Sequence, residues 1–305
     1  MVFGMERMDS VRIIAVGDNV VDKYLFRGVM YPGGQCVNTC VYAAMNGAEA
    51  AYMGIYGKDD AAAHIRHVLR ERGIDDSRSR QVEGENGYAC VALENNDRIF
   101  VGSNGGGVAA DCPFHFTPED IAYIKGFDLL YMNSNSFIER ELSELVGTGV
   151  PIVFDFSSSW DDGYLAQICP HIEMATLSCA HLSDKDRETE MQKAAALGVK
   201  IVLGTVGERG SYLLYQGEFF AQPAIAPERI SDTMGAGDSY FAAFLVSLLR
   251  QRTDGGLYGG DIRQKLQTAM RAGAEFAAKI CEMEGAFGCG IPLTGGVVDR
   301  RAAST

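Results

Sequence analysis

Short apolar runs alternate along the chain with longer segments whose apolar residues recur at helical spacing. Runs rich in β-branched residues predict buried strands at 12–16, 128–132, 152–156 and 200–203. The helical spacing predicts helices at 36–45, 61–72, 117–125, 185–196, 236–249 and 262–280. Thr117 followed by Pro118 is typical of a helix start. Strands that alternate with helices in this way form a parallel sheet with crossover helices packed on it.

Two stretches interrupt this alternation. Residues 22–30 predict a strand that leaves the first strand of the sheet, and 88–93 and 98–102 predict two short strands joined by an Asn-Asn-Asp turn. Ligands of parallel sheets bind at the carboxyl ends of the strands, so a small second sheet over that end would act as a lid. Without a Pro- or Ser-rich linker, we expect one domain over 1–305, with lid strands at about 22–32 and 86–106.

Composition narrows the class of protein. With 47% hydrophobic and 22% charged residues, the chain is typical of a globular protein. The 27 basic and 40 acidic residues give a net charge of −13, which disfavours nucleic acid or an anionic membrane as a partner. Neither a signal peptide nor a membrane span is predicted, and the cysteines form no CxxC pair. Cys36 with Cys40, and His64 with His67, lack further metal ligands, so we expect a reduced, cytoplasmic protein.

A glycine-rich turn carries the clearest chemical signal. Residues 232–239 read Asp-Thr-Met-Gly-Ala-Gly-Asp-Ser and lead directly into an apolar helix. The small residues Gly235, Ala236 and Gly237 let a ligand approach free backbone amides at the positive end of the helix, which favours an anion. Asp238 would repel that anion if it served only as a cap. A carboxylate at this position suits a base that takes a proton from a hydroxyl attacking a phosphoryl group.

The segment 232–238 resembles the signature of the ribokinase-like (PfkB) carbohydrate kinases. Gly33-Gly34-Gln-Cys-Val-Asn38 is similar to the sugar-side signature of that family, and Thr205-Val-Gly207-Glu-Arg-Gly210 to its nucleotide-side turn. The matching motifs follow the family order from about residue 12 to 290. The resemblance implies an α/β fold, a three-layer α/β/α sandwich with a mostly parallel central sheet and a small β-sheet lid. It also implies ATP-dependent phosphorylation of a sugar.

The resemblance further implies roles for individual residues. Asp238 would be the base, and the amides of residues 235–237 would stabilise the transferred phosphoryl group. Asp18 is open to two interpretations, a cap of the turn or a partner for a cationic amine on the substrate. Arg98 either reaches sugar or phosphate from the lid or lies in solvent. The other implied sugar ligands are Asp22, Gly33, Gly34 and Asn38, and the implied nucleotide site comprises Thr205, Gly207, Gly210 and Gly285.

The same resemblance implies which ions the protein binds and whether it forms a dimer. Mg²⁺ would neutralise the β- and γ-phosphates, and Asp232 matches a residue that binds a monovalent cation, such as K⁺, in some members. Many members carry an Asn-x-x-Glu motif that holds magnesium-bound water. Here the corresponding stretch is His181-Leu-Ser-Asp184, so Asp184 is assigned to the metal only through water. A lid of this kind also favours a homodimer.

A narrower resemblance concerns the substrate. Residues 17–22, 96–100, 154–161 and 285–286 are similar to the branch of this family that phosphorylates the 6-hydroxyl of fructoselysine, a sugar–lysine adduct formed by glycation. Kinases of fructose, ribose, other sugars or nucleosides are the alternatives within the family. From other classes, a non-catalytic sugar or nucleotide sensor is disfavoured by Asp238. A dinucleotide-dependent oxidoreductase is disfavoured because the turn at 17–20 lacks GxGxxG.

Overall fold

The central element of the structure is an eight-stranded sheet. The computed structural model describes residues 10–94, 97–253 and 256–294, with only the backbone at residues 94, 97 and 98. The strand order is β14-β13-β12-β11-β10-β9-β1-β4, and all neighbours from β12 to β4 are parallel. β13 is antiparallel to both of its neighbours. The strands are β1 Arg12–Val16, β4 Glu49–Met53, β9 Leu129–Asn133, β10 Ile152–Asp155, β11 Met174–Ser178, β12 Ile201–Thr205, β13 Ser211–Tyr215 and β14 Glu218–Gln222.

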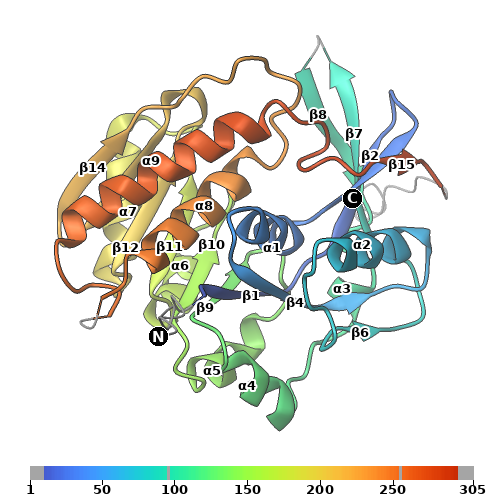
Figure 1. Cartoon of the computed structure of the whole chain (residues 1–305), viewed down its shortest axis with the longest axis horizontal. Coiled ribbons are helices and arrows are strands. Elements are labelled where there is room, and N and C mark those ends of the chain that lie inside the picture. Colours follow the sequence, from blue (N-terminus) through green and yellow to red (C-terminus); the bar gives the residue numbers. More distant parts are fainter. Residues whose placement is uncertain (1–9, 95–96, 254–255, 295–305) are drawn as a thin grey trace, which may run out of the picture.

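Helices cover both faces of this sheet, which confirms the three-layer prediction (Figure 1). Alternate residues of β1 point to opposite faces, Ile13 and Ala15 to one core and Ile14 and Val16 to the other. The first core is closed by α1 Gln35–Met45, α2 Asp60–Glu71, α8 Ala236–Arg250 and α9 Ile262–Ile280. The second is closed by α4 Pro118–Ile124, α5 Leu142–Val146, α6 Asp162–Ile168 and α7 Asp184–Ala196.

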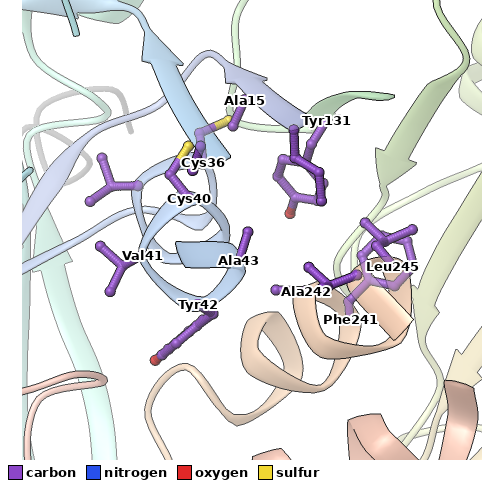
Figure 2. Packing of buried hydrophobic residues seen from close by; sticks show 14 of the residues in the cluster. Ala15, Cys36, Cys40, Val41, Tyr42, Ala43, Tyr131, Phe241, Ala242 and Leu245 are labelled. Carbon is purple, nitrogen blue, oxygen red and sulfur yellow. The ribbon is translucent and has the colours of Figure 1, made fainter. Parts of the chain in front are cut away.

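Helices α1 and α8 pack against each other over the sheet (Figure 2). Ala43 of α1 and Ala242 of α8 are fully buried between them, and the small side chains permit this close approach. The ring of Phe241 lies 6.2 Å from that of Tyr131 in β9, measured between centroids. Ten of the fifteen residues of α8 are buried, so its position is fixed by packing on nearly every side.

The lid is a separate five-stranded sheet with the order β15-β3-β2-β7-β8. Its strands are β2 Val20–Tyr24, β3 Val29–Gly33, β7 Gly87–Glu94, β8 Asp97–Ser103 and β15 Ile291–Pro292. The single strand predicted over residues 22–30 is wrong. The chain reverses there through four exposed residues, 25–28, and the amides of Arg27 and Gly28 both donate to the carbonyl of Tyr24. β2 therefore pairs antiparallel with β3 and parallel with β7.

The remaining elements are short. They are β5 Ile55–Tyr56, β6 Arg80–Gln81, α3 Val108–Asp111, and 3₁₀ turns at Glu139–Glu141, Cys169–His171 and Gly207–Arg209. The predicted start of α4 is confirmed, since the Thr117 side chain accepts from the Asp120 amide at 3.2 Å and Asp120 accepts from the Thr117 amide at 2.9 Å. In the described part of the chain, no helix combines the length and hydropathy that a membrane crossing requires.

Candidate active site

A cavity of about 840 Å³ lies where the carboxyl ends of the parallel strands face the lid. Asp18 follows β1, Asp155 ends β10 and Thr205 ends β12, and all three line the cavity. The lid contributes Asp22 from β2, with further residues from β7 and β8. The first residues of α1 and α8 line it as well. The fold therefore brings two helix N-termini, the edge of the sheet and the lid to one place.

The N-terminus of α8 offers amides to the cavity. Gly235 has φ +74, the left-handed conformation that glycine adopts without strain, and a Cβ there would lie 2.3 Å from the Tyr42 hydroxyl. The amide of Ala236 donates to the carbonyl of Thr233 at 3.2 Å, so it already serves the turn. Among the described residues, the amides of Gly235, Gly237 and Asp238 have no backbone acceptor. Of the three amides predicted to bind an anion, those of Gly235 and Gly237 are therefore available to a ligand, and the amide of Asp238 is available as well.

Asp238 lies in the wall of the same cavity, in the first turn of α8. The side-chain amide of Asn38 donates to its Oδ2 at 2.6 Å, which fixes the orientation of the carboxylate. Burial raises the pKa of Asp238 to about 7, and the nearby Asp155 adds to the increase. A carboxylate that titrates near neutral pH is a better proton acceptor than an ordinary aspartate. One helical turn thus carries both a carboxylate with a raised pKa and amides without a backbone acceptor.

Two acceptors in the cavity lack donors. Asp22 is 5% exposed and has no hydrogen-bond donor among the described residues, while the Oδ1 atom of Asn38 is buried without a partner. Burial, followed by repulsion from Asp232 and Asp18, raises the pKa of Asp22 to about 7. Gly33 makes room for this carboxylate, since a Cβ there would lie 2.7 Å from its Oδ2. Unpaired buried acceptors fit the hydroxyl donors of a sugar.

Asp18 caps helix α1. Its carboxylate accepts from the amides of Gln35 at 2.8 Å and Cys36 at 3.0 Å, and from the side-chain amide of Asn133 at 2.7 Å. Gly34, at φ +96, keeps the space beside Asp18 open, because a Cβ there would lie 2.9 Å from Oδ2. These contacts join Asp18 to helix α1 rather than to its own turn, where the cap was predicted, and the predicted contact with a cationic amine stays a prediction.

Asp232 joins three segments. It is fully buried and accepts from the Tyr24 hydroxyl of the lid at 2.8 Å, from the Met234 amide at 3.0 Å and from the Gly285 amide at 3.0 Å. Gly285 has a φ of +57, and a side chain would not fit there, since a Cβ would lie 2.1 Å from the Tyr31 ring. Asp232 therefore holds the anion-binding turn, the lid and the loop at Gly285 in register.

Not every predicted site residue reaches the cavity. Thr205 lines it, but Gly207 and Gly210 of the same turn do not. Gly210 instead packs on the neighbouring strand, because a Cβ there would lie 2.1 Å from the carbonyl oxygen of Gln222. The predicted residues that lie outside the described lining are Gly33, Gly207, Gly210, Gly285 and Asp184. The side chain of Arg98 lies outside the described part of the structure.

The predicted contact of Asp184 with magnesium-bound water stays a prediction, and the structure places Asp184 in ion pairs outside the described cavity lining. Asp184 begins α7 outside the cavity, and its carboxylate is paired with Arg187 at 2.6 Å and Arg209 at 3.1 Å. These two guanidinium groups lower the pKa of Asp184. Within the described ranges, no group of three or more His, Cys, Asp or Glu residues could hold a metal ion.

Sequence reasoning missed several residues of the cavity. Asp155 ends β10 and lines the cavity, and Gln35 donates to it at 2.9 Å. Its position at the end of a predicted strand was the available signal, because the carboxyl ends of parallel strands surround the ligand. Tyr24, which reaches Asp232 from the lid, gave no such signal.

The fold and the site together define a class of protein. A parallel sheet and a lid enclose amides without a backbone acceptor, a buried carboxylate beside them, and buried acceptors without donors. This arrangement is that of a phosphotransferase acting on an alcohol group. A sequence profile of the pfkB family of carbohydrate kinases matches residues 8–292. The chain therefore belongs to the pfkB family and is a carbohydrate kinase.

Individual relatives agree with this assignment. The fructosamine kinase FrlD of Bacillus subtilis (strain 168) is 40% identical over 283 residues, which cover 92% of this chain and 95% of that protein. The fructoselysine 6-kinase of Escherichia coli (strain K12) is 31% identical over 275 residues, covering 90% and 99%. The structure of Arabidopsis thaliana ribokinase complexed with ribose and ATP superposes with a TM-score of 0.74 at 21% identity, covering 91% and 94%. The last comparison confirms the ribokinase-like fold.

Gly237→Ala tests whether the α8 turn binds the transferred group. A Cβ at Gly237 would meet no protein atom within 4 Å, and Gly237 is among the residues that line the cavity. Alanine should leave the free energy of unfolding unchanged or raise it by up to about 1 kcal/mol, since it is the better helix residue. We expect kcat/KM to fall about 100-fold, because the methyl group displaces the phosphoryl group from its amides.

The matched control is Gly163→Ala, at the same position in the first turn of α6 and outside the cavity lining. Thermal unfolding and steady-state kinetics measure both variants. Full activity of Gly237→Ala would contradict the assignment of this turn.

Proposed function

We propose that the protein is an ATP-dependent kinase of fructosamines, sugar–amine adducts such as fructoselysine, and that it phosphorylates the 6-hydroxyl. The observation that carries the proposal is the placement of Asp238 beside the free amides of the α8 turn, in a cavity with unpaired acceptors. The substrate is inferred from the two relatives, whose names specify fructosamine and fructoselysine and which match about 90% of this chain.

The reaction assigned to this geometry is a direct transfer. The 6-hydroxyl oxygen attacks the γ-phosphorus of ATP, the bond from that phosphorus to the β-phosphate oxygen breaks, and Asp238 takes the hydroxyl proton. The products are ADP and the sugar 6-phosphate, and the proton passes from Asp238 to solvent. The amides of Gly235, Gly237 and Asp238 stabilise the charge on the transferred group. Asp22 and Asn38 hold the sugar hydroxyls.

Ions enter this proposal in two ways. Mg²⁺ is proposed as the ion that would neutralise the phosphates of ATP, and the proposal names no protein ligand for it. The predicted K⁺ at Asp232 stays a prediction, since the three described donors on that carboxylate serve to connect segments. Nucleotide contact is proposed for Thr205, which lines the cavity at the end of β12.

Asp238→Asn tests the base. The asparagine is nearly isosteric but does not accept the hydroxyl proton, so we expect kcat to fall about 100- to 10,000-fold. Asp162→Asn, at an exposed position of α6, is the control and should retain full activity. Near-native turnover of Asp238→Asn would exclude this residue as the base.

The pH dependence of the unsubstituted enzyme tests the same residue. Its kcat/KM should fall as the pH drops below about 7, the pKa to which burial raises Asp238, because the protonated carboxyl no longer accepts a proton.

A substrate panel tests the proposed function itself. ATP consumption is measured with fructoselysine, other fructosamines, fructose, ribose and adenosine. We expect the highest kcat/KM with a fructosamine, and ³¹P NMR of the product should place the phosphate on the 6-oxygen. Equal use of fructose and every fructosamine would limit the function to that of a general sugar kinase.

We further propose that the protein forms a homodimer through its lid. β8 is an edge strand of the lid sheet, and Val101 on it, outside the described cavity lining, is 43% exposed. An exposed apolar side chain on an edge strand favours association with a second copy. Sedimentation velocity of the purified protein should give the mass of a dimer, and a monomer at micromolar concentration would refute the proposal.

A further inference from the structure

The charged side chains in the described lining of the cavity are all acidic. Its described lining includes Asp18, Asp22, Asp155, Asp232 and Asp238, and no Lys, Arg or His. Two polar groups in this lining, the Asp22 carboxylate and Asn38 Oδ1, are nine-tenths or more buried and have no donor among the described residues. Buried carboxylates are costly unless a cation or several donors compensate them. The cavity is thus built for a ligand that brings donors and positive charge.

Four of these carboxylates already have a task. Asp18 caps α1, Asp232 connects the lid to the α8 turn, and Asp238 is the base. Asp22 faces the cavity from the lid without a donor and is assigned to the sugar hydroxyls. Asp155 is the carboxylate that the proposed mechanism leaves unused.

Asp155 is held rigidly by neutral groups. It is 7% exposed, and its Oδ1 accepts from the Ser157 amide at 2.7 Å. Its Oδ2 accepts from Gln35 Nε2 at 2.9 Å and faces the Tyr131 hydroxyl at 3.4 Å. Gln35 is itself fixed by Asn135, which donates to its Oε1 at 3.0 Å.

These donors leave acceptor capacity and negative charge on Asp155. A carboxylate has about four lone-pair sites, and three described donors approach this one. None of the three is charged, so the negative charge of Asp155 has no counter-charge among them. A cationic N–H group of the ligand would supply both the missing donor and the missing charge.

We propose that Asp155 is the specificity residue that receives the protonated amine of the substrate, with Gln35 and Asn135 holding its carboxylate in place. The inference rests on the proposed function, because a fructosamine differs from fructose by carrying an amine, protonated near neutral pH, in place of the 1-hydroxyl. Asp155 therefore discriminates the glycated amine from the free sugar.

Asp155→Asn tests this role by comparing a charged with a neutral substrate. The substitution keeps the size of the side chain and removes its charge. We expect kcat/KM for fructoselysine to fall about 10- to 100-fold, the range for a hydrogen bond to a charged group. For fructose it should change less than about threefold. The dissociation constants of both sugars in the presence of ADP, measured by calorimetry, should change in the same proportions.

Two comparison variants separate the alternatives. Asp22→Asn, in the same cavity, should weaken both sugars alike, because its carboxylate is assigned to hydroxyl groups that both share. Asp162→Asn, on the exposed surface of α6, should change neither. An equal loss for fructoselysine and fructose in Asp155→Asn would overturn the proposal and place Asp155 at the phosphates or at hydroxyl groups. Unchanged kinetics with both sugars would overturn it as well.

Different results would refute the proposed function and the proposed amine site at Asp155. If the unsubstituted enzyme turns over fructoselysine and Asp155→Asn does so equally well, the function stands and the amine site is refuted. If the unsubstituted enzyme does not turn over any fructosamine, the proposed function is refuted. The calorimetric comparison of fructoselysine with fructose then decides the amine site by itself.

Discussion

The site depends on one fully buried carboxylate, Asp232, that joins segments far apart in the chain. The Tyr24 hydroxyl binds it from the lid, the Met234 amide from the α8 turn and the Gly285 amide from the loop after α9. Because Tyr24 and Asp22 lie on the same strand of the lid, this contact also fixes the distance between Asp22 and the turn that carries Asp238. An uncompensated buried charge would be destabilising, so the three donors are required for the fold as well as for the site.

The buried carboxylates of the cavity cost folding free energy, and the proposed chemistry depends on them. Burial raises the pKa of Asp22 and Asp238 to about 7, so each carboxylate favours its neutral form and resists deprotonation in the free enzyme. Their contribution to the stability of the folded state is therefore fully present below the ordinary pKa of an aspartate, and it is lost as the pH rises from there through about 7. Binding of a ligand that donates hydrogen bonds or carries positive charge would therefore stabilise the ionised carboxylates. In the proposed function, backbone amides rather than cationic side chains receive the phosphate, which is compatible with an acidic protein.

The elements of the fold and the type of chemistry followed from the sequence. Periodicity is a local property, so the helix at 262–280 and the strand at 12–16 were predicted with the bounds that the structure shows. The turn at residues 235–238 was also predictable, because glycine at a helix start is needed where Gly235 has φ +74. Strands β4 and β11, with the sequences EAAYM and MATLS, were missed because small residues give a weak strand signal.

The tertiary structure determines which residues line the cavity and which are required only for packing. Gly210 and Gly285 belong to motifs that resemble binding turns, yet packing against Gln222 and Tyr31 explains both glycines. Asp155 lines the cavity because β10 lies between β9 and β11 in the sheet, and the carboxyl ends of these strands face the lid. Local sequence determines helices, strands and turns through short-range sterics and periodicity. The partners of a buried carboxylate come from residues up to 208 positions away in the chain, and only long-range packing selects them.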